Sequence, residues 1–282
     1  MRCAWQAYLN ILPQWMRKEI DTLGKNTLQE LRLRTGQAPE LILTETALQI
    51  NGHVRQEDLQ YVINCASQYS PWLSSTMSDG YLTTRGGHRI GICGTAVVED
   101  GRVRGIRDIS SLCIRVARDF PGIVNEESLD VGSVLILGPP GSGKTTLLRD
   151  LIRRRSDFGT GSIIVIDERG ELFPIIHGEG SFSTGRRTDI LRFCPKPHGV
   201  FAALKTMGPS CIAVDEITHE ADCAALQEVA RCGVDILATA HALDIQDLSK
   251  RQLYRNTISS GIFNHFVVMR KDKSWHLERI QL

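Results

Sequence analysis

The chain of 282 residues has few of the features that mark membrane-spanning, secreted or zinc-binding proteins. No apolar run is as long as a bilayer span, and the N-terminal segment Met1-Arg-Cys-Ala-Trp-Gln does not have a signal-peptide pattern. The eight cysteines form no C-x-x-C pair, so a zinc site is not indicated. These absences predict a cytoplasmic protein with reduced cysteines and no transmembrane segment. Any association with a membrane would then be peripheral or made through a partner.

The net charge is small as well, since 33 Lys and Arg residues nearly balance 32 Asp and Glu residues. A net charge of +1 argues against a broadly basic, nucleic-acid-binding body, although it leaves a local basic patch open. The sequence has no internal repeat and no low-complexity tract. A hydrophobic fraction of 42% supports well-packed cores, and the length suits one large domain or two ordinary ones.

The most informative stretch is Gly138-Pro-Pro-Gly-Ser-Gly-Lys144-Thr145, which reads G-x-x-x-x-G-K-[ST]. It follows the apolar run Ser133–Leu137 and precedes the helical pattern Thr145–Arg155, as a phosphate-binding P-loop should. Lys144 suits the β- and γ-phosphates of ATP, and the Thr145 hydroxyl suits Mg²⁺. The predicted nucleotide contacts are Gly138, Pro139, Pro140, Gly141, Ser142, Gly143, Lys144, Thr145 and Thr146.

Two acidic residues end the apolar segment Cys211–Val214, which is the pattern of a Walker B strand. Asp215 is the predicted metal-binding carboxylate, together with Thr145. Glu216 follows it and is the first choice for the general base that deprotonates water. The alternative is a buried strand whose terminal acids simply face solvent. The P-loop earlier in the chain favours the catalytic interpretation.

Two further apolar segments end in polar residues. Glu168 follows Ile163–Asp167, and we expect it to polarise the water, contact metal or replace Glu216 as the base. Thr239 and His241 end the segment from Leu237, where either could sense the γ-phosphate. For His241 the alternative is an ordinary turn histidine.

The first part of the chain has the pattern of a small α+β domain over residues 1–120, followed by a linker at 121–130. Helices are expected in Trp5–Leu23, with a break at Pro13, and at Gln56–Tyr69. The expected strands are Leu28–Leu33, Glu40–Thr44, Gly80–Thr84, His88–Val98, Arg102–Ile106 and Ser111–Val116, with hairpin turns in Gln49–Val54 and at Asp100-Gly101.

From residue 131 to 282, apolar strands alternate with amphipathic helices. This alternation predicts an α/β domain with a mostly parallel sheet and helices on both faces. The expected helices after the P-loop are Pro197–Met207 and Ala221–Cys232, and the expected strands are Ser162–Asp167, Cys211–Asp215, Val234–Ala238, Phe263–Met269 and Trp275–Ile280.

Arginines of the first domain are candidates for covering the nucleotide. Arg89 and Arg115, with Arg107 and Arg118, could bind phosphate from the same subunit or from a neighbour, as arginine fingers do. For each of them a solvated strand arginine is the alternative.

Taken together, the motifs resemble the stage III sporulation protein AA family of bacterial sporulation ATPases, which is similar to the ATPases of type II and type IV secretion systems. The resemblance covers nearly the whole chain. Beyond the P-loop and Val214-Asp-Glu-Ile217, it rests on Leu31–Gly36, Gly80–Thr84, Gly86–Gly91, Ile109–Arg118, Val165–Glu171, Asp189–Lys196 and Ala238–Ala242.

The resemblance implies a RecA-like core that acts as a homo-oligomeric ring, with a hexamer expected. Asp167-Glu168 would be its acidic box, His241 its histidine box, and Arg89 and Arg115 its nucleotide-facing arginines. The protein would hydrolyse ATP to energise assembly of, or transport through, a channel complex between mother cell and forespore. Its partners would be membrane proteins of that complex, which would hold it at the inner membrane on the mother-cell side.

The chain also departs from the secretion-ATPase pattern. Asp215-Glu216 stands where that pattern has Gly-Glu, alanines flank His241, and there is no four-cysteine zinc module. These departures put the mechanical output in question more than the ATPase chemistry. Two rival functions are a nucleotide-gated scaffold ring with little turnover and a nucleic-acid translocase.

Overall fold

The computed structural model describes residues 1–44, 46–67, 80–176 and 179–278. Residues 68–69 of one expected helix and 279–280 of the last expected strand lie outside the described residues. By its internal contacts the chain forms two compact units. Unit 1 is Met1–Asp119 with Pro174–Phe182, and unit 2 is Phe120–Phe173 with Ser183–Leu282. The division into two independently folding domains, with a linker at 121–130, stays a prediction.

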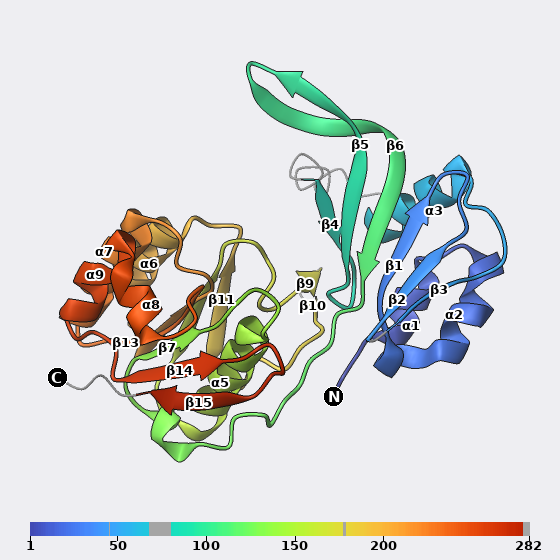
Figure 1. The fold of residues 1–282 in the computed structure, drawn as a ribbon. Helices are drawn as coiled ribbons and strands as arrows, with labels where there is room; N and C mark the ends of the chain where they lie inside the picture. Colours follow the sequence, from blue (N-terminus) through green and yellow to red (C-terminus); the bar gives the residue numbers. More distant parts are fainter. Residues whose placement is uncertain (45, 68–79, 177–178, 279–282) are drawn as a thin grey trace. The chain divides into compact units, whose positions relative to one another are not determined.

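Unit 1 packs helices against an antiparallel sheet, in the strand order β3-β2-β1-β6-β5-β4. Pro13 precedes α2 as its N-cap, which explains the break predicted there. Strands β5 and β6 run together beyond the rest of this sheet (Figure 1), around a turn with positive φ at Asp100 and Gly101. The elements are α1 (Trp5–Asn10), α2 (Gln14–Thr27), α3 (Gln56–Ser67), β1 (Leu28–Arg34), β2 (Glu40–Leu43), β3 (Ala47–Gln49), β4 (Tyr81–Thr83), β5 (Arg89–Glu99) and β6 (Arg102–Arg115).

Two details of unit 1 differ from the prediction. The hairpin predicted within Gln49–Val54 is wrong, because β3 pairs with β2 and the following residues turn back toward Gln37. There the backbone N–H of Val54 donates to the Gln37 carbonyl at 2.9 Å. The two strands predicted within residues 102–116 are one continuous strand, β6, since β5 and β1 together pair with it along its length.

Unit 2 contains a seven-stranded sheet in the order β11-β8-β12-β13-β7-β14-β15. Its strand pairs are parallel, except that β15 runs antiparallel to β14. This arrangement confirms the predicted α/β fold. The strands are β7 (Val134–Leu137), β8 (Ile163–Asp167), β11 (Thr188–Arg192), β12 (Cys211–Val214), β13 (Asp235–Ala240), β14 (His265–Met269) and β15 (Trp275–Glu278).

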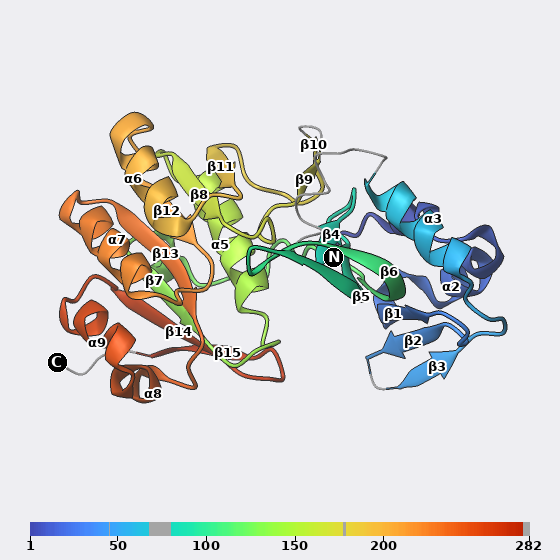
Figure 2. The ribbon, with the colours of Figure 1, turned by 90° about the horizontal axis from the view of Figure 1, so that it is seen from above.

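Helices cover both faces of this sheet. Figure 2 shows α5 (Lys144–Phe158) on one face and α6 (Lys196–Thr206) and α7 (Glu220–Arg231) on the other. The central strands are buried on both faces, so they read as continuous apolar runs in the sequence. No described helix, including α5 with its 15 residues, is long and apolar enough to cross a membrane.

Several short elements of the chain were not predicted. The strand β11 lies at the sheet edge and reads Thr-Asp-Ile-Leu-Arg, which is too polar to stand out as a buried strand. The others are β9 (Ile175–Ile176), β10 (Glu179–Gly180), the 3₁₀ helix η2 (Glu127–Asp130), α8 (Ile245–Lys250) and α9 (Gln252–Ser259).

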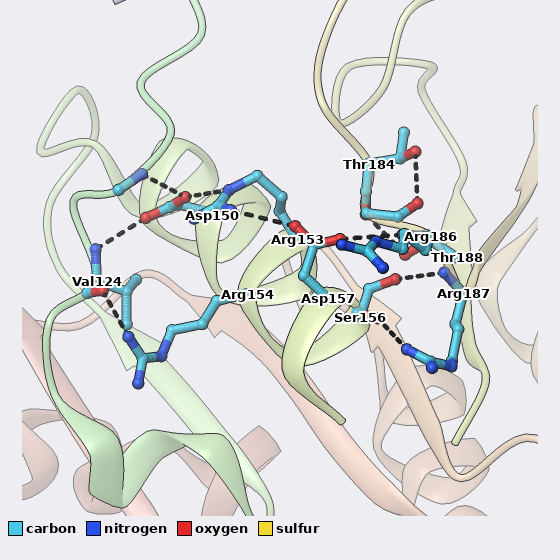
Figure 3. A network of polar contacts seen from close by, with 12 residues as sticks. Val124, Asp150, Arg153, Arg154, Ser156, Asp157, Thr184, Arg186, Arg187 and Thr188 are labelled. Carbon is cyan, nitrogen blue, oxygen red and sulfur yellow. Dashed lines mark hydrogen bonds and ion pairs between the residues drawn. The ribbon is translucent and has the colours of Figure 1, made fainter. Parts of the chain in front are cut away.

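Two side chains of α5, Asp150 and Ser156, hold the segments with which the chain enters unit 2 (Figure 3). The buried Asp150 carboxylate accepts hydrogen bonds from the backbone N–H groups of Gly122 and Val124, both at 2.8 Å. Further along α5, the Ser156 hydroxyl accepts a 2.7 Å hydrogen bond from the backbone N–H of Arg187. The helix that begins at the P-loop therefore also anchors both entering segments.

Candidate functional site

The P-loop joins the buried strand β7 to α5, and its glycines are required by its shape. Gly143 caps α5 with φ 100°, a conformation that favours glycine. A Cβ atom on Gly138 would lie 2.6 Å from the Ser142 hydroxyl and 2.9 Å from the Met269 carbonyl oxygen, so a side chain does not fit there. The first N–H groups of α5 have no acceptor within the helix, and they form a ready phosphate-binding end.

Lys144 is the first residue of α5, and only 6% of it is exposed. Its Nζ donates to the carbonyl oxygens of Gly138 at 2.9 Å and Pro139 at 3.1 Å, and to Nδ1 of His241 at 3.0 Å. Burial lowers the pKa of Lys144, and the nearby carboxylates of Asp215 and Glu216 oppose that shift. The three protons of the ammonium are thus all donated, and a phosphate could take the place of the carbonyls.

Asp215, directly after β12, is held by two hydroxyl groups. The Thr145 hydroxyl donates to its Oδ2 at 2.9 Å, and the buried Thr239 hydroxyl donates to its Oδ1 at 2.5 Å. Thr239 lies in β13, the strand next to β12. The P-loop helix and the ends of two adjacent strands therefore meet at one carboxylate.

Thr145 and Asp215 offer a hydroxyl and a carboxylate oxygen, the kind of ligand atoms that Mg²⁺ prefers. Mg²⁺ is usually bound through one or two carboxylates together with substrate phosphates, and it keeps several of its waters. Within the described residues no group of three or more His, Cys, Asp or Glu side chains could hold a metal by itself. A hydroxyl and a single carboxylate beside a P-loop fit a metal that arrives with a nucleotide.

Glu216 has a left-handed backbone conformation, with φ 55°, and its N–H donates to the Thr239 hydroxyl at 2.8 Å. Its carboxylate lies 3.2 Å from Nε2 of His241 and 3.0 Å from the guanidinium of Arg169. Because Nδ1 of His241 accepts from Lys144, the opposite ring nitrogen, Nε2, is the one that faces Glu216. The Lys144 ammonium and the Glu216 carboxylate are therefore connected through one imidazole ring.

The two acidic residues at the end of β8 have different surroundings. Asp167 is 2% exposed and accepts the backbone N–H groups of residues 171, 172 and 173. Burial raises the pKa of Asp167, and these N–H groups counteract the shift, so Asp167 holds the loop after β8. Glu168 instead forms an ion pair with Lys196.

A small cavity lies at the carboxyl ends of β8 and β12. Its volume is about 20 Å³, enough for one water molecule. Glu168 and Glu216, the two candidates for the base, both line it. The other lining residues are Asp167, Arg169, Glu171, Lys196 and Asp215.

Arg89 and Arg115 lie in unit 1, where they are direct partners across β5 and β6. The Arg89 guanidinium lies 4.2 Å from the centre of the Tyr81 ring. Arg115 donates to the Glu30 carboxylate at 3.1 Å. Their contact with a nucleotide stays a prediction.

The sequence motifs give no role to Arg169 or Lys196. Arg169 directly follows Glu168, so an arginine beside an acidic pair was the available signal. Lys196 ends the Cys194-Pro195-Lys196 stretch, which belongs to the family resemblance and indicates no partner for its charge. Neither partner could be identified without the fold, because Glu216 is 47 residues from Arg169 and Glu168 is 28 residues from Lys196.

Two of the known structures that resemble this chain are a pilus retraction motor and an ATPase. One is the pilus retraction motor PilT with bound ADP, with a TM-score of 0.64 and 16% identity over 93% of this chain and 81% of PilT. Another is the ATPase DotB of Legionella pneumophila, with a TM-score of 0.60 and 17% identity over 94% of this chain and 79% of DotB. These likenesses confirm the predicted fold, a RecA-like P-loop core with a smaller N-terminal part.

Two sequence comparisons establish the family. Stage III sporulation protein AA of Bacillus subtilis (strain 168) is 33% identical over 277 residues, which cover 93% of this chain and 90% of that protein. The family model described as "Sporulation stage III, protein AA" matches residues 5–278. The resemblance carried by the motifs is thus confirmed, and the chain belongs to the sporulation stage III protein AA family.

Proposed function

We propose that the chain is an ATP hydrolase whose nucleotide site is the P-loop together with the ends of β12 and β13. The observation that carries the proposal is the 2.9 Å hydrogen bond from Thr145 to Asp215, because it joins the P-loop to the acidic end of β12. Lys144 would bind the β- and γ-phosphates, and the loop Gly138–Thr146 would surround them, with the backbone N–H groups of Gly141–Thr146 as donors. ADP bound in PilT, which has the same fold, supports this assignment.

The proposed reaction is attack of water on the γ-phosphorus. The water oxygen bonds to phosphorus, the bond between the γ-phosphorus and its bridging oxygen to ADP breaks, and Glu216 takes the proton. Bound Mg²⁺, held by Thr145 and Asp215, would neutralise charge on the phosphate oxygens. His241 would orient Glu216, and Lys144 would stabilise the transferring group.

We extend the proposal to a ring, with a hexamer expected, in which Arg89 and Arg115 face a nucleotide of the same subunit or of a neighbour. The family supports a role in sporulation. That role is to energise assembly of, or transport through, a channel complex between mother cell and forespore. The partners would then be membrane proteins of this complex, and the ring would sit peripherally at the inner membrane on the mother-cell side.

The test measures phosphate release and nucleotide binding with purified protein, Mg²⁺ and ATP, with and without the membrane partners. Wild type should release phosphate, Lys144→Ala should lose ATP binding, and Glu216→Gln should bind ATP but turn over about a thousandfold more slowly. Wild-type protein that binds ATP but releases no more phosphate than Lys144→Ala would exclude the motor and support the scaffold ring. Binding of single-stranded DNA that depends on ATP would instead support a translocase.

A further inference from the structure

Lys196 is a buried cation in an unfavourable local position. It is the first residue of α6, where the helix dipole disfavours positive charge, and its side chain is 6% exposed. A buried ammonium requires a compensating anion. Two carboxylates supply it: Glu168 forms an ion pair with Nζ, and Asp222 lies 3.8 Å away.

Asp222 does not depend on Lys196 for its own role. Its carboxylate accepts the backbone N–H groups of Thr218 at 3.0 Å and His219 at 3.2 Å, which caps the start of α7. Glu168 is held differently from Asp222. Its side chain is 36% exposed, and it forms an ion pair with Lys196. Lys196 therefore matters more for the position of Glu168 than for that of Asp222, which the two backbone N–H groups also hold.

The pair of Lys196 and Glu168 lies at the wall of the water-sized cavity. Glu216, the proposed base, lines the same cavity, as does Asp215. A carboxylate paired with a buried, rigidly placed ammonium keeps a fixed orientation, and it can then accept a hydrogen bond from a water in that space.

We propose that Lys196 is a positioning residue for ATP hydrolysis, which holds the Glu168 carboxylate so that it orients the attacking water. Glu168 accepts a hydrogen bond from this water and takes no proton. The proton goes to Glu216, the water oxygen bonds to the γ-phosphorus, and ADP leaves. The proposal rests on the proposed function, and it assigns the two glutamates different tasks.

The test compares Lys196→Met, which removes the charge at similar length, with Lys205→Met on the exposed side of the same helix. We expect Lys196→Met to lower kcat by about 100-fold, because a misplaced water costs rate and not nucleotide affinity. The KM for ATP should change by no more than about twofold. Lys196→Arg, which keeps a cation, should recover part of kcat, and Lys205→Met should match wild type.

A double-variant cycle separates positioning from a structural role. If Lys196 acts through Glu168, Lys196→Met combined with Glu168→Gln should be no slower than Glu168→Gln alone. Additive losses, or Lys196→Met at the wild-type rate, would overturn the proposal. Where Lys196→Met does not fold, Lys196→Gln takes its place, and failure of both to fold would make Lys196 structural and overturn the proposal as well.

Failure of this inference is distinguishable from failure of the proposed function. Wild-type turnover that is lost in Glu216→Gln but unchanged in Lys196→Met overturns the role of Lys196 alone. Wild-type protein that releases no more phosphate than Lys144→Ala overturns both.

Discussion

The Lys144 ammonium donates a hydrogen bond to Nδ1 of His241 at 3.0 Å, which joins the first residue of the P-loop helix to the end of β13. The opposite nitrogen of the same ring lies 3.2 Å from the Glu216 carboxylate. A single imidazole therefore touches both the proposed phosphate ligand and the proposed base. We therefore expect a change at the phosphates to reach the base through this ring.

His241 should consequently affect turnover more than nucleotide binding. His241→Ala removes the ring that contacts Glu216 and the acceptor for Lys144, and we expect kcat to fall by about 100-fold with ATP affinity within a few-fold of wild type. Steady-state phosphate release and equilibrium ATP binding measure the two effects. His276→Ala, at an exposed position of β15, is the matched control. A His241→Ala protein as fast as wild type would show that the ring is only a turn residue.

Thr145 should determine the requirement for Mg²⁺. Thr145→Val keeps the shape of the side chain but removes the hydroxyl that meets Asp215, so the Mg²⁺ concentration for half-maximal turnover should rise on the order of tenfold. Thr145→Ser keeps the hydroxyl and should stay close to wild type. A magnesium titration of ATP turnover compares the three proteins, and equal midpoints would remove Thr145 from the metal site.

The sequence predicted most of unit 2 because its strands are buried on both faces and end in recognisable residues. The P-loop, Asp215, Glu216 and His241 were all expected at strand ends, and the fold brings them together there. Arg169 and Lys196 were missed because each pairs with a carboxylate far along the chain, and no local pattern records such a partner. The hairpin turn predicted within Gln49–Val54 was wrong for a similar reason, since the backbone N–H of Val54 donates to the Gln37 carbonyl and not within the local segment.

Gly138 should tolerate no side chain. In Gly138→Ala the new Cβ would approach the Met269 carbonyl oxygen to 2.9 Å, and the resulting strain should lower the free energy of unfolding by about 1–3 kcal/mol. Gly141→Ala is the comparison, because a Cβ there meets nothing within 4 Å and costs only the left-handed conformation, about 1 kcal/mol. Urea unfolding should rank Gly138→Ala as the less stable protein, and the opposite order would contradict the packing argument.

His88 should make unit 1 less stable in acid. The ring is fully buried, accepts from the backbone N–H of Ala117 at 3.1 Å and donates to the Ala4 carbonyl at 3.0 Å. Burial lowers the pKa of His88 from 6.5 to about 4, so between these values the unfolded chain binds a proton that the folded chain does not. Stability should therefore fall as the pH drops from about 6.5 to 4, by roughly 3 kcal/mol from this group.

The check for His88 is the pH dependence of urea unfolding in wild type and His88→Gln. His88→Gln should be less stable at pH 7 but should lose less stability between pH 6.5 and 4, because the titrating ring is gone. Other groups titrate in both proteins, so the difference between the two curves is the relevant quantity. Parallel curves would show that His88 does not titrate across folding.

Asp150 should control the segment at residues 120–124. Its carboxylate is 2% exposed and accepts from the backbone N–H groups of Gly122 and Val124 and from Arg153, each at 2.8 Å. Asp150→Ala leaves these donors without their acceptor, so the free energy of unfolding should fall by about 3 kcal/mol and cleavage near Val124 should accelerate in limited proteolysis. Arg153→Gln removes one donor but leaves the carboxylate with both backbone groups, so it should change cleavage little. If Asp150→Ala and Arg153→Gln are cleaved equally fast, the carboxylate does not hold this segment on α5.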